Sequence, residues 1–170
     1  MEMNSLKEDI YNSTLGMYGY LKKQDYYKDI NSYALYTDDS FMSISFAFNT
    51  NSYLEKKKND EYYLTYKFSP AEWFSETLRN DVIIYKNIYF EKVSHLLKKM
   101  ALSNYNYEEM FIDYCISALK EFKCNNEIEK NKLLLFMVSD YFDEENIINW
   151  NSQLNTSQVV SEMKIWLKSE

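Results

Sequence analysis

The feature that most constrains the fold is an uninterrupted apolar run, Leu133–Val138, with the sequence LLLFMV. A strand that has one face in water alternates apolar and polar residues, and this run has no polar position. It therefore predicts a strand that is covered on both faces and lies in the centre of its sheet. Asp143, Glu144 and Glu145 follow shortly afterwards, where acidic side chains favour the start of a helix through its dipole.

A second constraint is the boundary SPAEW at residues 69–73. Ser69 is a good helix cap, and Pro70, the only proline, suits a first helical position. Glu72 stands where a capping-box carboxylate reaches back to the cap. We therefore expect a strand over residues 62–68 to end here and a helix to begin.

The rest of the chain alternates between the two periods of regular structure. Residues 33–37 and 41–48 have a period of two around the Asp38-Asp39-Ser40 turn, which predicts a hairpin. Residues 82–85 are compatible with a short strand or a buried loop. Helical spacing of apolar residues predicts helices over residues 4–22, 90–101, 110–122 and 159–167. The capping-box spacing of Ser52 and Glu55 predicts a short helix over residues 52–58. The sum is an α+β fold: a mainly antiparallel sheet of about four strands with helices packed against it.

Composition limits the domain count and the class of partner. The 170 residues contain no linker rich in Pro, Gly or Ser, so we expect one domain over residues 1–170. A net charge of −7 disfavours nucleic acid and anionic membrane surfaces. No apolar run approaches the ~20 residues of a membrane span, and Met1 is followed by no leader-like segment, so we expect a cytoplasmic protein. Cys115 and Cys124 are interpreted as structural thiols.

Few residues are suited to catalysis. His95 is the only histidine and lies within a predicted amphipathic helix, so we interpret it as structural or merely exposed. With two glycines in the whole chain there is no Gly-rich phosphate loop. We predict no catalytic, cofactor-binding or metal-binding residue, and no enzymatic activity.

Four aspartates are the remaining candidates. Asp38 and Asp39 follow the first predicted strand, and Asp140 and Asp143 follow the last. If these strands run parallel and adjacent, their carboxyl ends bring the acids to one edge of the sheet, where they suit Mg²⁺ or a cationic side chain. The alternative is structural: Asp38 and Asp39 form a turn, and Asp140 and Asp143 start a helix.

Short motifs distributed along the chain support a family resemblance. An ALYTDD-like strand end is followed by an SPAEW-like junction and a later strand that ends in Ser-Asp, in residues 33–39, 49–50, 69–73, 138–140 and 154–155. In this order the motifs resemble an uncharacterised bacterial family whose members look like immunity proteins of polymorphic toxin systems. The resemblance implies that the protein binds and inactivates a cognate toxin, and it implies no catalytic residue.

Three functional hypotheses follow. The first is an immunity-type protein that neutralises a cognate bacterial toxin domain, expected to be basic, by non-covalent occlusion. The partner-binding surface we predict for it comprises Tyr36, Asp38, Asp39, Asp140 and Asp143. The second is a metal-dependent hydrolase that uses the four aspartates, and the third is a general protein-binding adaptor or regulator. The sequence predicts no oligomeric state.

Overall fold

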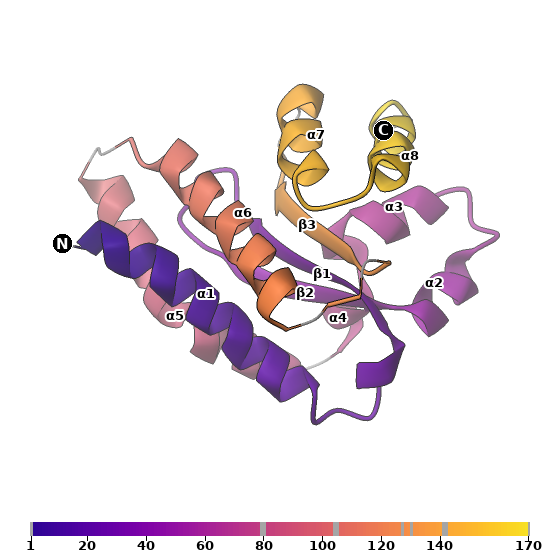
Figure 1. The fold of residues 1–170 in the computed structure, drawn as a ribbon, viewed down its shortest axis with the longest axis horizontal. Helices are drawn as coiled ribbons and strands as arrows, with labels where there is room; N and C mark the ends of the chain where they lie inside the picture. The colour runs from indigo at the N-terminus through magenta and orange to yellow at the C-terminus, as the bar shows by residue number, and fades with distance from the viewer. Residues whose placement is uncertain are drawn as a thin grey trace.

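The fold is α+β (Figure 1). The computed structural model describes residues 2–78, 81–103, 106–126, 128–129, 131–140 and 143–169. Within these residues the elements are α1 (Glu2–Leu21), η1 (Tyr27–Asp29), β1 (Ile30–Thr37), β2 (Ser45–Thr50), α2 (Asn51–Lys57), α3 (Tyr63–Phe68), η2 (Pro70–Glu72), α4 (Phe74–Thr77), α5 (Asp81–Leu102), α6 (Glu108–Asn125), β3 (Leu133–Val138), α7 (Glu144–Ser152) and α8 (Ser157–Leu167). The α elements are α-helices and the η elements are 3₁₀ helices.

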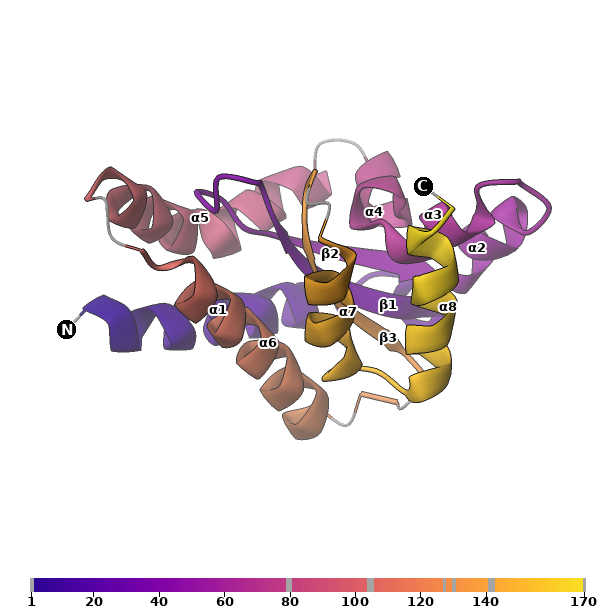
Figure 2. The same cartoon turned by 90° about the horizontal axis from the view of Figure 1, so that it is seen from above.

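The sheet is mixed and has the order β2-β1-β3 in the described part of the chain. Leu35 in β1 pairs with Phe46 in antiparallel β2 and with Phe136 in parallel β3. Helices α1, α5 and α6 group on one side of the sheet in Figure 1, and α7 and α8 lie on the other. Figure 2 shows α7 over the sheet and α8 beside α3. The prediction of about four mainly antiparallel strands is therefore corrected to a mixed sheet with three strands among the described residues.

Aromatic rings fill the space between the sheet and α1, α5 and α6. The ring of Tyr33 in β1 lies edge-on to Phe122 of α6 and to Tyr18 of α1, with centroids 5.6 and 5.9 Å apart. Phe46 in β2 stacks on Phe90 of α5. These side chains are buried, and full burial of one such ring contributes roughly 1.5–3 kcal/mol.

The run Leu133–Val138 forms a buried strand, as predicted, but at the edge of the sheet and not in its centre. Two asparagine side chains occupy the place of a neighbouring strand. Asn151 of α7 accepts from the Phe136 N–H at 3.0 Å and donates to the Phe136 carbonyl at 2.9 Å. Asn155 does the same for Leu134, at 3.1 and 2.6 Å. Because these asparagines bind the outward N–H and carbonyl groups of Leu134 and Phe136, β3 can lie at the edge of the sheet without a polar side chain of its own.

The expected strand over residues 62–68 is wrong: this segment is helix α3. Its aromatic composition favours a strand locally, but packing against α2 decides the outcome. The Tyr66 ring lies edge-on to Tyr53, and the Lys57 ammonium group is 4.1 Å from the centre of the Tyr66 ring. Ser69 ends α3 by donating its N–H to the Thr65 carbonyl at 2.8 Å, and makes no side-chain cap.

Several smaller boundaries also move. The second strand begins at Ser45 and not at Phe41, whose φ of 55° lies outside the β region. Helix α2 is capped by Thr50, whose hydroxyl accepts from the Tyr53 N–H. Residues 82–85 belong to α5. The predicted helices over residues 4–22, 90–101, 110–122 and 159–167 are confirmed as α1, part of α5, α6 and α8. Within the described ranges, no helix has the length and apolar character to cross a membrane.

Candidate functional site

The carboxyl ends of β1 and β3 lie side by side. Thr37 is in register with Val138, and the Ser139 N–H donates to the Thr37 carbonyl at 2.8 Å. The chain therefore leaves both strands at the same edge, which confirms the assumption that these two strands are parallel and adjacent. In open sheets with parallel strands, this edge is the usual place for a ligand.

A groove of about 500 Å³ lies at this edge, which we call the carboxyl-end groove. Its floor is apolar and buried, and consists of Pro70, Met137, Val138, Ile147 and Trp166. Its remaining lining residues are Tyr36, Ser69, Ala71, Ser139, Asp140, Glu144 and Leu167. Of these, Ala71, Ser139, Asp140 and Glu144 are exposed, and we call the exposed residues the rim. Among the described residues, those that line the groove include two acids and no lysine or arginine.

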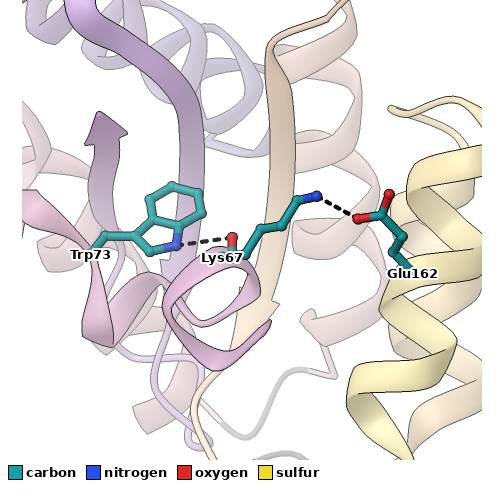
Figure 3. Close-up of polar contacts among 3 residues, drawn as sticks. All are labelled: Lys67, Trp73 and Glu162. Carbon is teal, nitrogen blue, oxygen red and sulfur yellow. Dashed lines mark hydrogen bonds and ion pairs between the residues drawn. The ribbon is translucent and has the colours of Figure 1, made fainter. Parts of the chain in front are cut away.

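Contacts between α3 and α8 hold one wall of the groove. Figure 3 shows the Lys67 side chain extending from α3 to form an ion pair with Glu162 of α8, while the Trp73 indole N–H donates to the Lys67 carbonyl at 3.2 Å. The Trp166 indole N–H donates to the Thr65 hydroxyl at 3.3 Å. Trp166, which lines the groove, is thereby held against α3.

Asp140 forms part of the rim in an uncommon backbone conformation. Its φ is 55°, in the left-handed region, which Asp tolerates better than most side chains. The Ser139 hydroxyl donates to Asp140 Oδ2 at 3.2 Å. The carboxylate is exposed and faces the groove as one of its lining groups, so it can receive a cationic group or another hydrogen-bond donor.

Tyr36 lines the groove from β1 and is half-buried. Burial raises the pKa of its hydroxyl, the negative charge of Glu76 raises it further, and a hydrogen bond with Ser45 lowers it by less. The hydroxyl therefore stays protonated at neutral pH, and the residue offers an aromatic ring with a neutral polar end.

The other predicted site residues have structural contacts. Asp38 accepts hydrogen bonds from the hydroxyls of Ser40 and Ser43 and, at 3.0 Å, from the Met42 N–H. Burial alone raises the pKa of Asp38, but these hydrogen bonds outweigh it and the net pKa is lowered. Asp38 thus holds the loop between β1 and β2.

Asp143 caps α7, as its position after β3 predicts. Its side chain accepts from the Asn146 N–H at 3.0 Å and from the Asn146 amide at 2.9 Å. Asp39 is exposed beside Asp38. Of the five predicted residues, the groove therefore includes Tyr36 and Asp140. In the part of the chain that the structure describes, no group of three or more His, Cys, Asp or Glu side chains could hold a metal ion.

The only histidine borders a different depression. His95 is exposed on α5, consistent with the prediction, and lines a hollow of about 560 Å³ with Ser43, Ser45 and Ser94 among its neighbours. The Ser94 hydroxyl accepts from the Ile44 N–H at 3.4 Å. This hollow contains both Glu91 and Lys98 and so has no single sign of charge.

Sequence reasoning did not identify most of the groove. Glu144 was interpreted only as a helix-start acid, and Trp166 and Leu167 only as the apolar face of a helix. The segments 69–71 and 138–140, quoted above as parts of motifs, are 67 residues apart at their nearest ends and meet at the groove. The only indication in the sequence was that both segments belong to the quoted motifs, SPAEW and the strand end Val138-Ser139-Asp140.

Comparison with known proteins gives one result. A family model described as "Domain of unknown function (DUF4303)" matches residues 6–156. The matched range includes both parallel strands, residues 69–71 and Glu144, and it ends before α8. Comparisons with curated proteins and with solved structures gave no significant match.

Proposed function

We propose, from the premise that this chain belongs to the DUF4303 family, that it is an immunity-type protein that binds and neutralises a cognate bacterial toxin domain by non-covalent occlusion. The observation that carries the proposal is the carboxyl-end groove, in which an apolar floor and an acidic rim occur together. The proposed role is binding without catalysis, and it rests also on the resemblance described above.

The chemistry of the groove suits recognition of a protein. Buried apolar side chains form its floor, while Asp140 and Glu144 remain exposed to solvent at its rim. An apolar centre with a polar rim is the usual anatomy of a protein interface, and aromatic residues are common anchors there. Tyr36 and Trp166 supply such rings at this site.

The charge of the chain supports a basic partner. With a net charge of −7, the protein attracts a positively charged domain over distances of about the Debye length, roughly 8–10 Å at physiological salt. Complementary charge mainly accelerates association and excludes wrong partners. The proposed partner is therefore a basic toxin domain.

Co-expression tests the proposal directly. The toxin encoded beside this gene is induced in cells with and without this protein, and survival is counted. We expect survival only in the presence of the protein, and we expect the two purified proteins to form a complex by size-exclusion chromatography. Equal killing in both strains, with the protein present at normal levels, contradicts the proposal.

The hydrolase hypothesis has one favourable observation and its own test. Asp38 and Asp140 follow parallel neighbouring strands at one edge, as the hypothesis requires. It predicts a saturable rise in melting temperature with Mg²⁺ or Mn²⁺ that Asp140→Asn abolishes. If the melting temperature is independent of both ions, this hypothesis is wrong.

The adaptor hypothesis predicts instead that affinity capture from the native cell retains a partner without a toxin's delivery domain.

A further inference from the structure

We infer that the carboxyl-end groove binds a single long basic side chain, lysine or arginine, presented by the partner protein. This inference rests on the proposed function for the identity of the partner, and on the groove alone for the chemistry of recognition.

The shape of the groove matches the two parts of such a side chain. Lysine and arginine have an apolar stem and a charged end, and they are most stable where the stem lies on apolar surface and the end meets a carboxylate or water. The stem would lie on the floor formed by Val138, Ile147 and Trp166, which is buried beneath the rim. The charged end would reach Asp140 and Glu144.

The charges around the groove favour a cation over an anion. In the part of the chain that the structure describes, the charged residues of its lining are Asp140 and Glu144, and both are acidic. Lys164 and Lys168 do not line the groove. They border a neighbouring depression together with Glu144 and Glu145.

The groove is largely preformed, which reduces the cost of binding. Its walls are held by the Lys67–Glu162 ion pair and by the indole hydrogen bonds of Trp73 and Trp166 (Figure 3). A site that does not reorganise loses less conformational entropy when it binds. Tyr36 also lines the groove, and an aromatic ring can attract an arginine guanidinium.

Short peptides test the inference without a toxin. Four peptides that differ at one position, carrying arginine, lysine, citrulline or norleucine, are titrated into the ¹⁵N-labelled full chain. We expect amide shifts at residues 138–140 and around Glu144 with arginine and lysine, and at least tenfold weaker responses with uncharged citrulline and with norleucine. Equal responses to arginine and citrulline contradict the inference.

Charge-matched variants locate the effect. Asp140→Asn with Glu144→Gln should weaken binding of the arginine peptide by about tenfold or more. The control, Asp113→Asn with Glu121→Gln, removes the same charge from exposed positions of α6 on the other side of the sheet and should leave binding unchanged. Melting temperatures establish that both variants are folded. Equal weakening by both pairs means that only the net charge matters, and the inference fails.

The same variants in the toxin complex separate this inference from the proposed function. If the wild-type chain binds toxin and the Asp140→Asn/Glu144→Gln variant binds it equally well, the proposed function stands and the groove inference is wrong. If the chain binds the arginine peptide in the groove but never binds the toxin, the proposed function is wrong and the chemistry of the groove stands. We expect the variant to lose affinity for the toxin by at least tenfold.

Discussion

Individual side chains at the carboxyl end of the sheet divide into those that shape the backbone and those that remain available to a partner. The carboxylates of Asp38 and Asp143 accept hydrogen bonds from nearby N–H groups, and that of Asp38 also accepts from hydroxyl groups. Asp140 and Glu144 are exposed at the groove. Removing an acid of the first kind should change stability, whereas removing one of the second kind should change binding.

The pH dependence of stability tests the role of Asp38. Its folded pKa lies below the ordinary value of 3.8, so the carboxylate contributes stability above that value and loses it as pH falls through the folded pKa. We expect Asp38→Asn to reduce the free energy of unfolding at pH 7 and to flatten its decrease below about pH 4. Urea unfolding at pH 3 to 7 measures this. The exposed neighbour Asp39→Asn is the control, and parallel curves for Asp38→Asn and wild type contradict the assignment.

The left-handed conformation of Asp140 predicts which substitutions are tolerated there. Asn accepts a φ of 55° about as well as Asp, while alanine is disfavoured by roughly 1 kcal/mol. We expect the free energy of unfolding of Asp140→Asn to lie within about 0.5 kcal/mol of the wild-type value. We expect that of Asp140→Ala to be about 1 kcal/mol lower than the wild-type value. Chemical denaturation of the two variants decides this, and equal stabilities would contradict the strain argument.

A contact between elements explains one of the two glycines of α1, Gly16. A Cβ built on Gly16 would stand 2.4 Å from two ring atoms of Tyr89 in α5, while one on Gly19 meets nothing within 4 Å. The Ser13 hydroxyl also donates to the Tyr89 carbonyl at 2.6 Å. Helix α1 therefore approaches α5 closely at Gly16 and not at Gly19.

The two glycines form a matched pair of substitutions. Alanine is favoured over glycine in a helix by up to about 1 kcal/mol. We expect Gly19→Ala to raise the free energy of unfolding by about 0.5–1 kcal/mol. We expect Gly16→Ala to lower it by roughly 1–2 kcal/mol, because overpacking against the Tyr89 ring exceeds the helix gain. Thermal and urea unfolding measure both, and two stabilising substitutions would show that the helices do not meet as described.

The side-chain amides of Asn151 and Asn155 bind the backbone of β3 along its outer edge. Asn151 is fully buried, and Asn151→Ala leaves the Phe136 N–H and carbonyl without their partner. An unsatisfied buried polar group costs about 1–3 kcal/mol, so we expect a total loss of roughly 2–4 kcal/mol. Hydrogen exchange should accelerate most at Phe136. Ser152→Ala, on the exposed side of α7, is the control, and a loss no larger than that of the control contradicts the role.

Elements whose stabilising contacts are local in sequence could be predicted, and elements decided by distant contacts could not. The apolar spacing of α6 is contained within its own residues, and so is the capping of α7 by Asp143. The place of β3 at an edge depends on Asn151 and Asn155, which lie 15 and 21 residues from their partners. Likewise α3 packs against α2 and α8, and no local feature of residues 62–68 predicts a helix.

At the scale of the whole molecule, the groove joins segments that a sequence pattern cannot place together. The parallel pairing of β1 and β3 was only an assumption from the two aspartate pairs, and the structure shows it. A helix does begin after Ser69, as expected, although it is the short 3₁₀ helix η2. The wall formed by residues 69–71 and α8 could still not be predicted, because no local pattern places these two segments together. Tyr36 and Asp140 were identified for their chemistry, and Glu144 was not.

The uneven placement of charge predicts how a partner associates. If the groove end meets a basic toxin, association should slow as salt rises from about 50 to 300 mM, while dissociation changes less, because screening acts mainly on the approach. Glu144→Lys and Glu121→Lys change the net charge equally, at the groove and on α6 on the other side of the sheet. Stopped-flow mixing should show the larger loss of association rate for Glu144→Lys, because Glu144 contributes both to the long-range attraction of the toxin and to the contact surface. Equal losses would mean that the toxin senses only total charge and that the binding surface lies elsewhere.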